Sequence, residues 1–203
     1  MKIEGARHAL EETKTMLVSL RGDIFSALDY AIEHISEAQG DLGNNENPRV
    51  LSRQEIEDIF GKFDYTDRDD GLINIAGPWA QENVITLKIH SHLIPCYIIP
   101  CHKLIAPQLA GFLTEVWAKK LDAHLGNYDG CWVARHMCWN REKPLSRHSW
   151  GIAIDFGTEK YPYGSPEKRN PGIIEIAEKW GFLNGQIFPQ PDPMHFEWVR
   201  FVL

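Results

Sequence analysis

The chain has 203 residues, 43% of them hydrophobic, which is enough to bury the core of one globular domain with a small appendage. Its formal net charge of −7 argues against a nucleic-acid-binding protein, which needs a clustered basic face. No segment approaches the roughly 18 to 20 apolar residues of a membrane-spanning helix, so membrane insertion is not expected. The first residues mix acids and bases without an apolar run, which predicts synthesis in the cytoplasm without a signal peptide.

Residues 1–48 are predicted to form a helical N-terminal arm and a linker. Apolar side chains recur every three or four positions between residues 9 and 35, which is the spacing of an amphipathic helix. Residues 37–49 are rich in glycine and asparagine, which is typical of a linker. We interpret the helix as an arm that packs on the main domain or on a second copy of the chain. A cell-wall-targeting module is the alternative.

Residues 49–203 are predicted to form an α+β domain with a small, mainly antiparallel sheet and flanking helices. The elements alternate without a regular βαβ period and without glycine-rich phosphate loops. Helices are expected after the capping box Ser52–Glu55, at Leu109–Leu121 with an end near Gly126, and at Ile173–Trp180. Strands are expected at Asn83–Ile89, Leu93–Ile99, Trp132–Met137, Ile152–Phe156 and Met194–Val199.

The four cysteines follow no metal-binding spacing; they are Cys96, Cys101, Cys131 and Cys138. We interpret them as buried reduced thiols, since unpaired cysteine is usually a small core residue. A disulfide such as Cys96–Cys101 is left open.

A motif at residues 146–155, Ser-Arg-His-Ser-Trp-Gly-Ile-Ala-Ile-Asp, carries the first group of chemically useful side chains. We interpret its end as a strand in which Asp155 faces the side opposite the two isoleucines. The glycine and alanine on the same face leave room for a bulky group. His148 precedes Asp155 by seven residues, so the chain has to turn near Gly151 if both side chains are to converge.

The second group lies in residues 191–198, Pro-Asp-Pro-Met-His-Phe-Glu-Trp. On a strand, His195 and Glu197 share one face, and Asp192 is expected in a turn between two prolines. Two histidines and one carboxylate are a typical ligand set for a catalytic zinc ion, with a fourth position open for water. A further carboxylate near that water would act as general base. Glu197 either orients His195 from behind or is itself that base.

The first motif resembles the SxHxxGxAxD motif of the LAS metallopeptidases. This M15 group contains D-alanyl-D-alanine carboxypeptidases, dipeptidases and phage L-alanyl-D-glutamate endolysins. The resemblance covers roughly residues 50–203 and includes residues 101–103, which are similar to VanY-like members. It implies the LAS or Hedgehog-like peptidase fold and one Zn²⁺ ion per chain, held by His148, Asp155 and His195.

The same resemblance implies roles for residues around the metal ion. The family's catalytic base lies three positions before the last ligand, which implies Asp192. An arginine on a preceding strand polarises the scissile carbonyl, which implies Arg135. Ser146 and Trp150 are expected beside the site, in contact with the substrate, and filling the core is the alternative for Trp150. Residues 160–170 are interpreted as a loop over the cleft or as a plain connector.

The resemblance implies a zinc peptidase that hydrolyses the stem peptides of peptidoglycan. Carboxypeptidase members usually have glutamate as the base, so Asp192 favours an endolysin-like L-alanyl-D-glutamate endopeptidase. Such an enzyme is expected to reach the cell wall by holin-type lysis or on a phage particle. A D-alanyl-D-alanine carboxypeptidase is the alternative. A non-catalytic cell-wall-binding or structural module is the alternative of another class.

Overall fold

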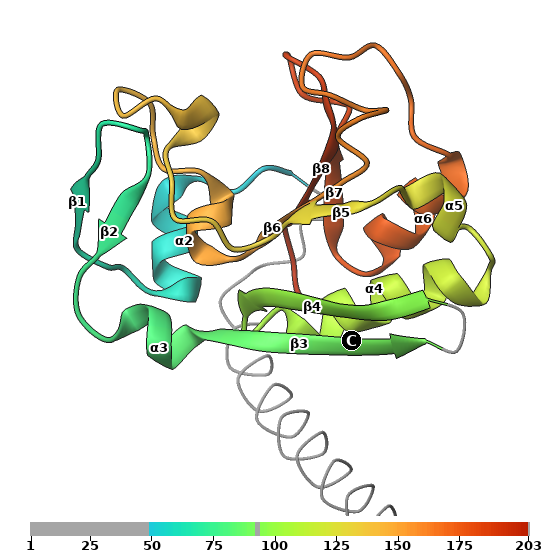
Figure 1. Cartoon of the computed structure of the whole chain (residues 1–203), viewed down its shortest axis with the longest axis horizontal. Helices are drawn as coiled ribbons and strands as arrows, with labels where there is room; N and C mark the ends of the chain where they lie inside the picture. Colours follow the sequence, from blue (N-terminus) through green and yellow to red (C-terminus); the bar gives the residue numbers. More distant parts are fainter. Residues whose placement is uncertain (1–48, 92–93, 203) are drawn as a thin grey trace, which may run out of the picture. The chain divides into compact units, whose positions relative to one another are not determined.

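The computed structural model describes residues 49–91 and 94–202 (Figure 1). The arm and linker predicted for residues 1–48, and self-association through that arm, lie outside the described residues. The part of the chain that is described has the predicted α+β composition, with small antiparallel sheets and a few helices. None of its helices combines the length and the apolar character needed to cross a membrane.

The first half of the described chain contains one helix with a sequence-encoded start and two hairpins. The Ser52 hydroxyl accepts a hydrogen bond from the amide of Glu55, and the Glu55 carboxylate accepts one from the amide of Ser52, so the predicted capping box is confirmed. The two hairpins are β1–β2 and β3–β4, both antiparallel. The elements are α2 (Arg53–Phe60), β1 (Tyr65–Asp67), β2 (Ile73–Ile75), α3 (Trp79–Asn83), β3 (Val84–Ser91) and β4 (Ile94–His102).

The second half forms a four-stranded antiparallel sheet in the order β5-β6-β8-β7, so that β6 and β8 lie at its centre. Three helices and two short 3₁₀ helices, η1 and η2, accompany it. In chain order the elements are α4 (Ala106–Ala118), α5 (Asp122–Leu125), β5 (Tyr128–Gly130), η1 (Met137–Trp139), η2 (Arg147–Trp150), β6 (Ala153–Phe156), α6 (Pro171–Lys179), β7 (Phe182–Gly185) and β8 (Asp192–Trp198).

The main core lies between this sheet and the helices. In Figure 1 the β3–β4 hairpin runs alongside α4, which also contacts α6. Phe112 of α4 packs against Phe182 of β7 and Phe196 of β8, with ring centroids 5.6 and 5.5 Å apart. All three side chains are fully buried, so β7 and β8 are fixed from one side by apolar packing.

Two predicted elements differ from the structure. The prediction of a strand at Trp132–Met137 is wrong. The backbone there forms hydrogen bonds with several different segments instead of pairing with one neighbouring strand. Leu72 and Leu145 each form only an isolated bridge with this stretch, which ends in η1. The long helix ends at Ala118 and a short helix follows to Leu125, since Lys120 between them takes a left-handed conformation with φ of 58°.

Three cysteine side chains lie within the described part of the chain. Cys101 and Cys131 are buried free thiols, as predicted, whereas Cys138 is exposed. The interpretation as a buried thiol is therefore wrong for Cys138, which lies in η1 on a loop at the surface. Cys101 is a free thiol, and the side chain of Cys96, with which a disulfide was left open, lies outside those that the structure describes.

Candidate metal centre

The first half of the site is a 3₁₀ turn that leads into a regular strand. The hydroxyl of Ser146 accepts a hydrogen bond from the amide of His148 at the start of η2. The turn closes at Gly151, whose φ of 67° is left-handed. A β-carbon at Gly151 would lie 2.9 Å from the backbone nitrogen of His102, so both the conformation and the space require glycine. The predicted turn between His148 and Asp155 is confirmed.

The second half of the site is a bulge in β8. Asn184 of β7 is paired with Phe196, yet the next residue, Gly185, is paired with Asp192. Residues 193–195 therefore lie outside the pairing with β7, and the bulge carries His195. On its other side β8 is paired regularly with β6, and the last pair places Asp155 opposite His195. The turn expected at Asp192 is thus the bulged start of a strand.

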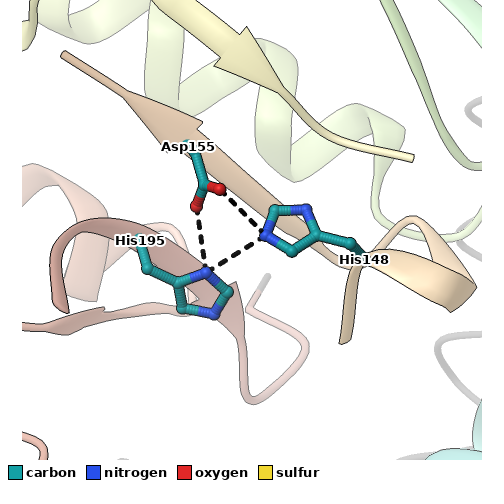
Figure 2. A group of neighbouring side chains, drawn as sticks. All are labelled: His148, Asp155 and His195. Atoms are coloured by element: carbon teal, nitrogen blue, oxygen red, sulfur yellow. Dashed lines mark hydrogen bonds and ion pairs between the residues drawn. The ribbon is translucent and has the colours of Figure 1, made fainter. Parts of the chain in front are cut away.

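Three side chains from these segments meet at one point (Figure 2). The Asp155 carboxylate lies 3.2 Å from His148 Nε2 through Oδ2 and 3.0 Å from His195 Nδ1 through Oδ1. The two histidine nitrogens are 3.3 Å apart. One donor atom from each residue lies within 4.8 Å of the others. The structure therefore brings together the three residues that the sequence suggested as metal ligands.

The hydrogen-bond partners of the outer imidazole nitrogens decide which ring nitrogens of this cluster could bind a cation. His148 Nδ1 lies 2.7 Å from the Cys131 carbonyl oxygen, which only accepts, so this nitrogen carries the proton and Nε2 has a free lone pair. His195 Nε2 lies 3.2 Å from a Glu197 carboxylate oxygen, so the neutral form of this ring carries its proton on Nε2 and has its lone pair on Nδ1. Two lone pairs and the Asp155 carboxylate then converge, and this donor set fits a zinc ion.

The charges inside the cluster show how strongly the groups interact. Burial acts to raise the pKa of Asp155, but contacts with His148 and His195 outweigh it and hold the pKa well below the usual range. Burial acts to lower the pKa of His195, but the carboxylates of Asp155 and Glu197 outweigh it and raise the pKa to about 10, so the ring holds a second proton that a metal ion would displace on binding. The Asp155 carboxylate therefore stays ionised at neutral pH, as a cation ligand must.

Asp192 lies beside the cluster with an unsatisfied carboxylate oxygen. Its Oδ1 is buried and has no hydrogen-bond partner among the described residues. Burial raises the pKa of Asp192, and the nearby charge of Asp155 acts in the same direction, while His195 and Arg135 act to lower it. A carboxylate with a raised pKa and a free oxygen is suited to receiving and releasing a proton.

A cavity of about 500 Å³ opens onto His148, His195 and Asp192. The side chain of Arg135 lines it, and burial lowers the pKa of this guanidinium. The Arg135 guanidinium carbon lies 5.1 Å from the ring centre of Trp139. Arg135 thus lines the same cavity as the expected metal ligands, although it lies on irregular backbone instead of a strand.

The aromatic rim of this cavity was not identified from the sequence. Trp139 and Tyr163 line the cavity and remain 54% and 53% exposed, so their rings are accessible to a bound ligand. Tyr163 lies within residues 160–170, so one residue of the segment interpreted as a loop over the cleft or as a connector lines the cavity. Isolated aromatic residues in predicted loops carry no signal that separates a rim from ordinary surface.

The two residues expected to contact substrate have different positions. Ser146 lines the cavity, although its hydroxyl also caps the turn at His148. Trp150 is fully buried, and its indole nitrogen donates to the Gly61 carbonyl at 3.0 Å. A contact between Trp150 and substrate is therefore excluded in this conformation, and the alternative of core packing against Phe63 holds.

Glu197 lies behind His195, on the side away from the cluster. Its carboxylate holds His195 Nε2 and lies 3.9 Å from Nε of Arg147, a variable position of the first motif that the sequence analysis did not single out. This arrangement favours an orienting role for Glu197 over a role as the base, because the His195 ring stands between its bonded oxygen and the cluster.

Comparison with known proteins adds one match. A family model described as D-alanyl-D-alanine carboxypeptidase matches residues 139–198, which include His148, Asp155, Asp192 and His195. The match supports the M15 peptidase family. Arg135 lies just before the matched residues, so its assignment depends on the cavity and the sequence resemblance. No curated protein and no solved structure matches the chain.

Proposed function

We propose that this protein is a zinc-dependent peptidase that hydrolyses the stem peptides of peptidoglycan. The observation that carries the proposal is the convergence of two imidazole lone pairs and the Asp155 carboxylate next to a cavity, with the unsatisfied carboxylate of Asp192 nearby. The match to the M15 peptidases supports the class of substrate.

His148, Asp155 and His195 would hold the ion, and Glu197 would keep the His195 ring in place. Zinc supplies Lewis-acid chemistry, which polarises a carbonyl and makes water more acidic. The Asp192 carboxylate then takes the proton of the attacking water and passes it to the leaving amine. The Arg135 guanidinium donates hydrogen bonds to the carbonyl oxygen as negative charge develops there.

Within this class we propose an L-alanyl-D-glutamate endopeptidase, because aspartate at position 192 is the base more familiar among the endopeptidases. A D-alanyl-D-alanine carboxypeptidase is the second candidate, since the matching family model has that description. The half-exposed rings of Trp139 and Tyr163 line the cavity and are accessible to a bound peptide.

The test is digestion of purified peptidoglycan by the full-length, zinc-loaded protein, with the products identified by mass spectrometry. New N-terminal D-glutamate would support the endopeptidase, and released D-alanine would support the carboxypeptidase. The Asp192→Asn variant is the matched control, because it should keep the metal and release neither product. If the wild-type protein binds peptidoglycan and produces no fragment, the enzyme proposal is wrong and a binding module is favoured.

A further inference from the structure

The bulged part of β8 raises the question of what holds it in place. Residues 193–195 lie outside the pairing with β7, and the pairing with β6 ends at the pair Asp155–His195. A strand segment without regular partners has backbone carbonyls to satisfy. In the described chain two buried side chains from elsewhere, Arg169 and Asn184, bond to these carbonyls.

Arg169 is the more unusual of the two, because a charged side chain is here almost fully buried, with a relative exposure of 2%. Among the described residues no carboxylate bonds to it, and its hydrogen bonds go to backbone carbonyls. Its Nε donates to the Pro193 carbonyl at 2.7 Å, and its Nη1 donates to the Leu125 carbonyl at 2.6 Å. Its Nη2 donates to the Phe156 carbonyl. Two further carbonyls, those of His124 and Met194, lie at 3.5 Å.

These contacts match the chemistry of a guanidinium. Arginine has five N–H donors in one plane, and here each of them faces a backbone carbonyl. The Tyr161 ring lies against the group, 3.9 Å from its carbon to the ring centre. Burial lowers the pKa of Arg169 to about 10, so the group keeps its charge at neutral pH. A lysine could not make this planar set of bonds.

The bonded carbonyls are neighbours of the metal centre. Phe156 follows Asp155 directly, and Pro193 and Met194 lie between Asp192 and His195. Asn184 completes the arrangement from the β7 side, since its amide nitrogen donates to the carbonyls of Pro193 at 3.0 Å and His195 at 2.9 Å. The two side chains therefore tie the end of β6 to the bulge of β8 at the point where the ladder stops.

We propose that Arg169 is a positioning residue for the metal centre. Together with Asn184, it sets the spacing between Asp155 on β6 and His195 in the bulge of β8. The inference rests on the proposed metal centre but does not require any particular substrate. Residues 160–170 would then contribute to the site in two ways. Tyr163 lines the cavity, and Arg169, near the end of the same loop, positions the metal ligands.

The experiment compares Arg169→Lys with a control at the opposite end of β8, in the full-length protein. Gln108 is the matched control: it is buried, donates to the carbonyls of Trp180 and Arg200, and accepts from the Trp198 indole. Both variants lose buried bonds to backbone carbonyls around the same sheet. Only Arg169→Lys should alter the ligand geometry.

Three quantities are measured: the thermal midpoint of the metal-free protein, the affinity for Co²⁺ with its visible absorption spectrum, and amide hydrogen exchange of residues 192–196. We expect Arg169→Lys to weaken Co²⁺ binding by about 10- to 100-fold, to shift the spectrum, and to speed exchange in the bulge. Gln108→Leu should lower the thermal midpoint while the spectrum and the exchange in the bulge stay unchanged.

An unchanged spectrum and affinity in Arg169→Lys would overturn the proposal, as would equal losses of affinity in both variants. If Arg169→Lys does not fold, Asn184→Ala removes the second pair of bonds and should produce the same pattern. The exchange measurement needs no metal, so it tests Arg169 even if the wild-type protein fails to bind Co²⁺. An inactive wild-type protein with this pattern would contradict the proposed function and leave the role of Arg169 intact.

Discussion

The segment from His148 to Asp155 reaches the metal centre through its own backbone, whereas the segment from Asp192 to His195 depends on residues far away in the sequence. The first turns through η2, closes at Gly151 and continues as a regular strand. The second is a bulge whose carbonyls are held by Arg169 and by a residue of β7. The comparison indicates that a local turn sets the backbone path of the first half, although the Cys131 carbonyl orients the His148 ring, whereas side chains of other segments hold the backbone of the second half.

The largest effect is expected from removing a ligand of the locally encoded half. His148→Ala should abolish tight zinc binding and all hydrolysis, because two ligands from β6 and β8 leave the ion with half of a tetrahedral shell. Metal content after dialysis and peptide release from peptidoglycan are the measurements. His136→Ala is the control, since this histidine is also buried but bonds to Asp67 outside the cluster. If His148→Ala still bound one zinc ion per chain, His148 would not be a metal ligand.

The next largest effect separates catalysis from binding within the bulged half. Asp192→Asn should retain zinc and lower the turnover number by about 10²- to 10⁴-fold, the range for loss of a general base. The reason is that an amide of the same shape cannot accept the proton that the carboxylate takes. Turnover and zinc affinity are measured on the same preparation. Normal turnover in this variant would show that another residue acts as the general base, and Glu197 would be tested first.

A smaller effect is expected behind the cluster. Glu197→Gln should weaken zinc binding by about tenfold, at the low end of the range for residues that orient a ligand. The amide oxygen still accepts from His195 Nε2, but the negative charge that strengthens the ring as a ligand is lost. Competition with a chelator gives the affinity. A fall in turnover without any change in affinity would contradict the orienting role.

The smallest effect concerns the turn of the first half. Gly151→Ala should lower the free energy of unfolding by about 1–3 kcal/mol, because alanine is strained at this left-handed position and its β-carbon meets His102. Gly77→Ala is the control, since its φ is 71° and no atom lies within 4 Å of the added carbon. Urea unfolding of both variants measures the difference, and equal losses would mean that the close approach at Gly151 contributes nothing.

Helices and strands could be predicted from the sequence where a short local pattern specifies them. The capping box at Ser52 predicted the start of α2, and alternating apolar residues predicted β6 and β8. The strand predicted at Trp132–Met137 did not form, because a strand-like composition does not show whether a neighbouring strand is available for pairing. Its amides bond to several segments that only the folded chain brings near, among them Ser149 through its hydroxyl.

The sequence by itself determined the chemistry of the centre: which side chains can bind a metal ion, and that a turn at Gly151 is needed to bring His148 and Asp155 together. Only the tertiary structure decided that Trp150 fills the core, that Glu197 stands behind His195, and that Arg169 ties β6 to the bulge of β8. The physical reason is that ligand chemistry belongs to a single side chain, whereas burial and spacing depend on every segment packed around it.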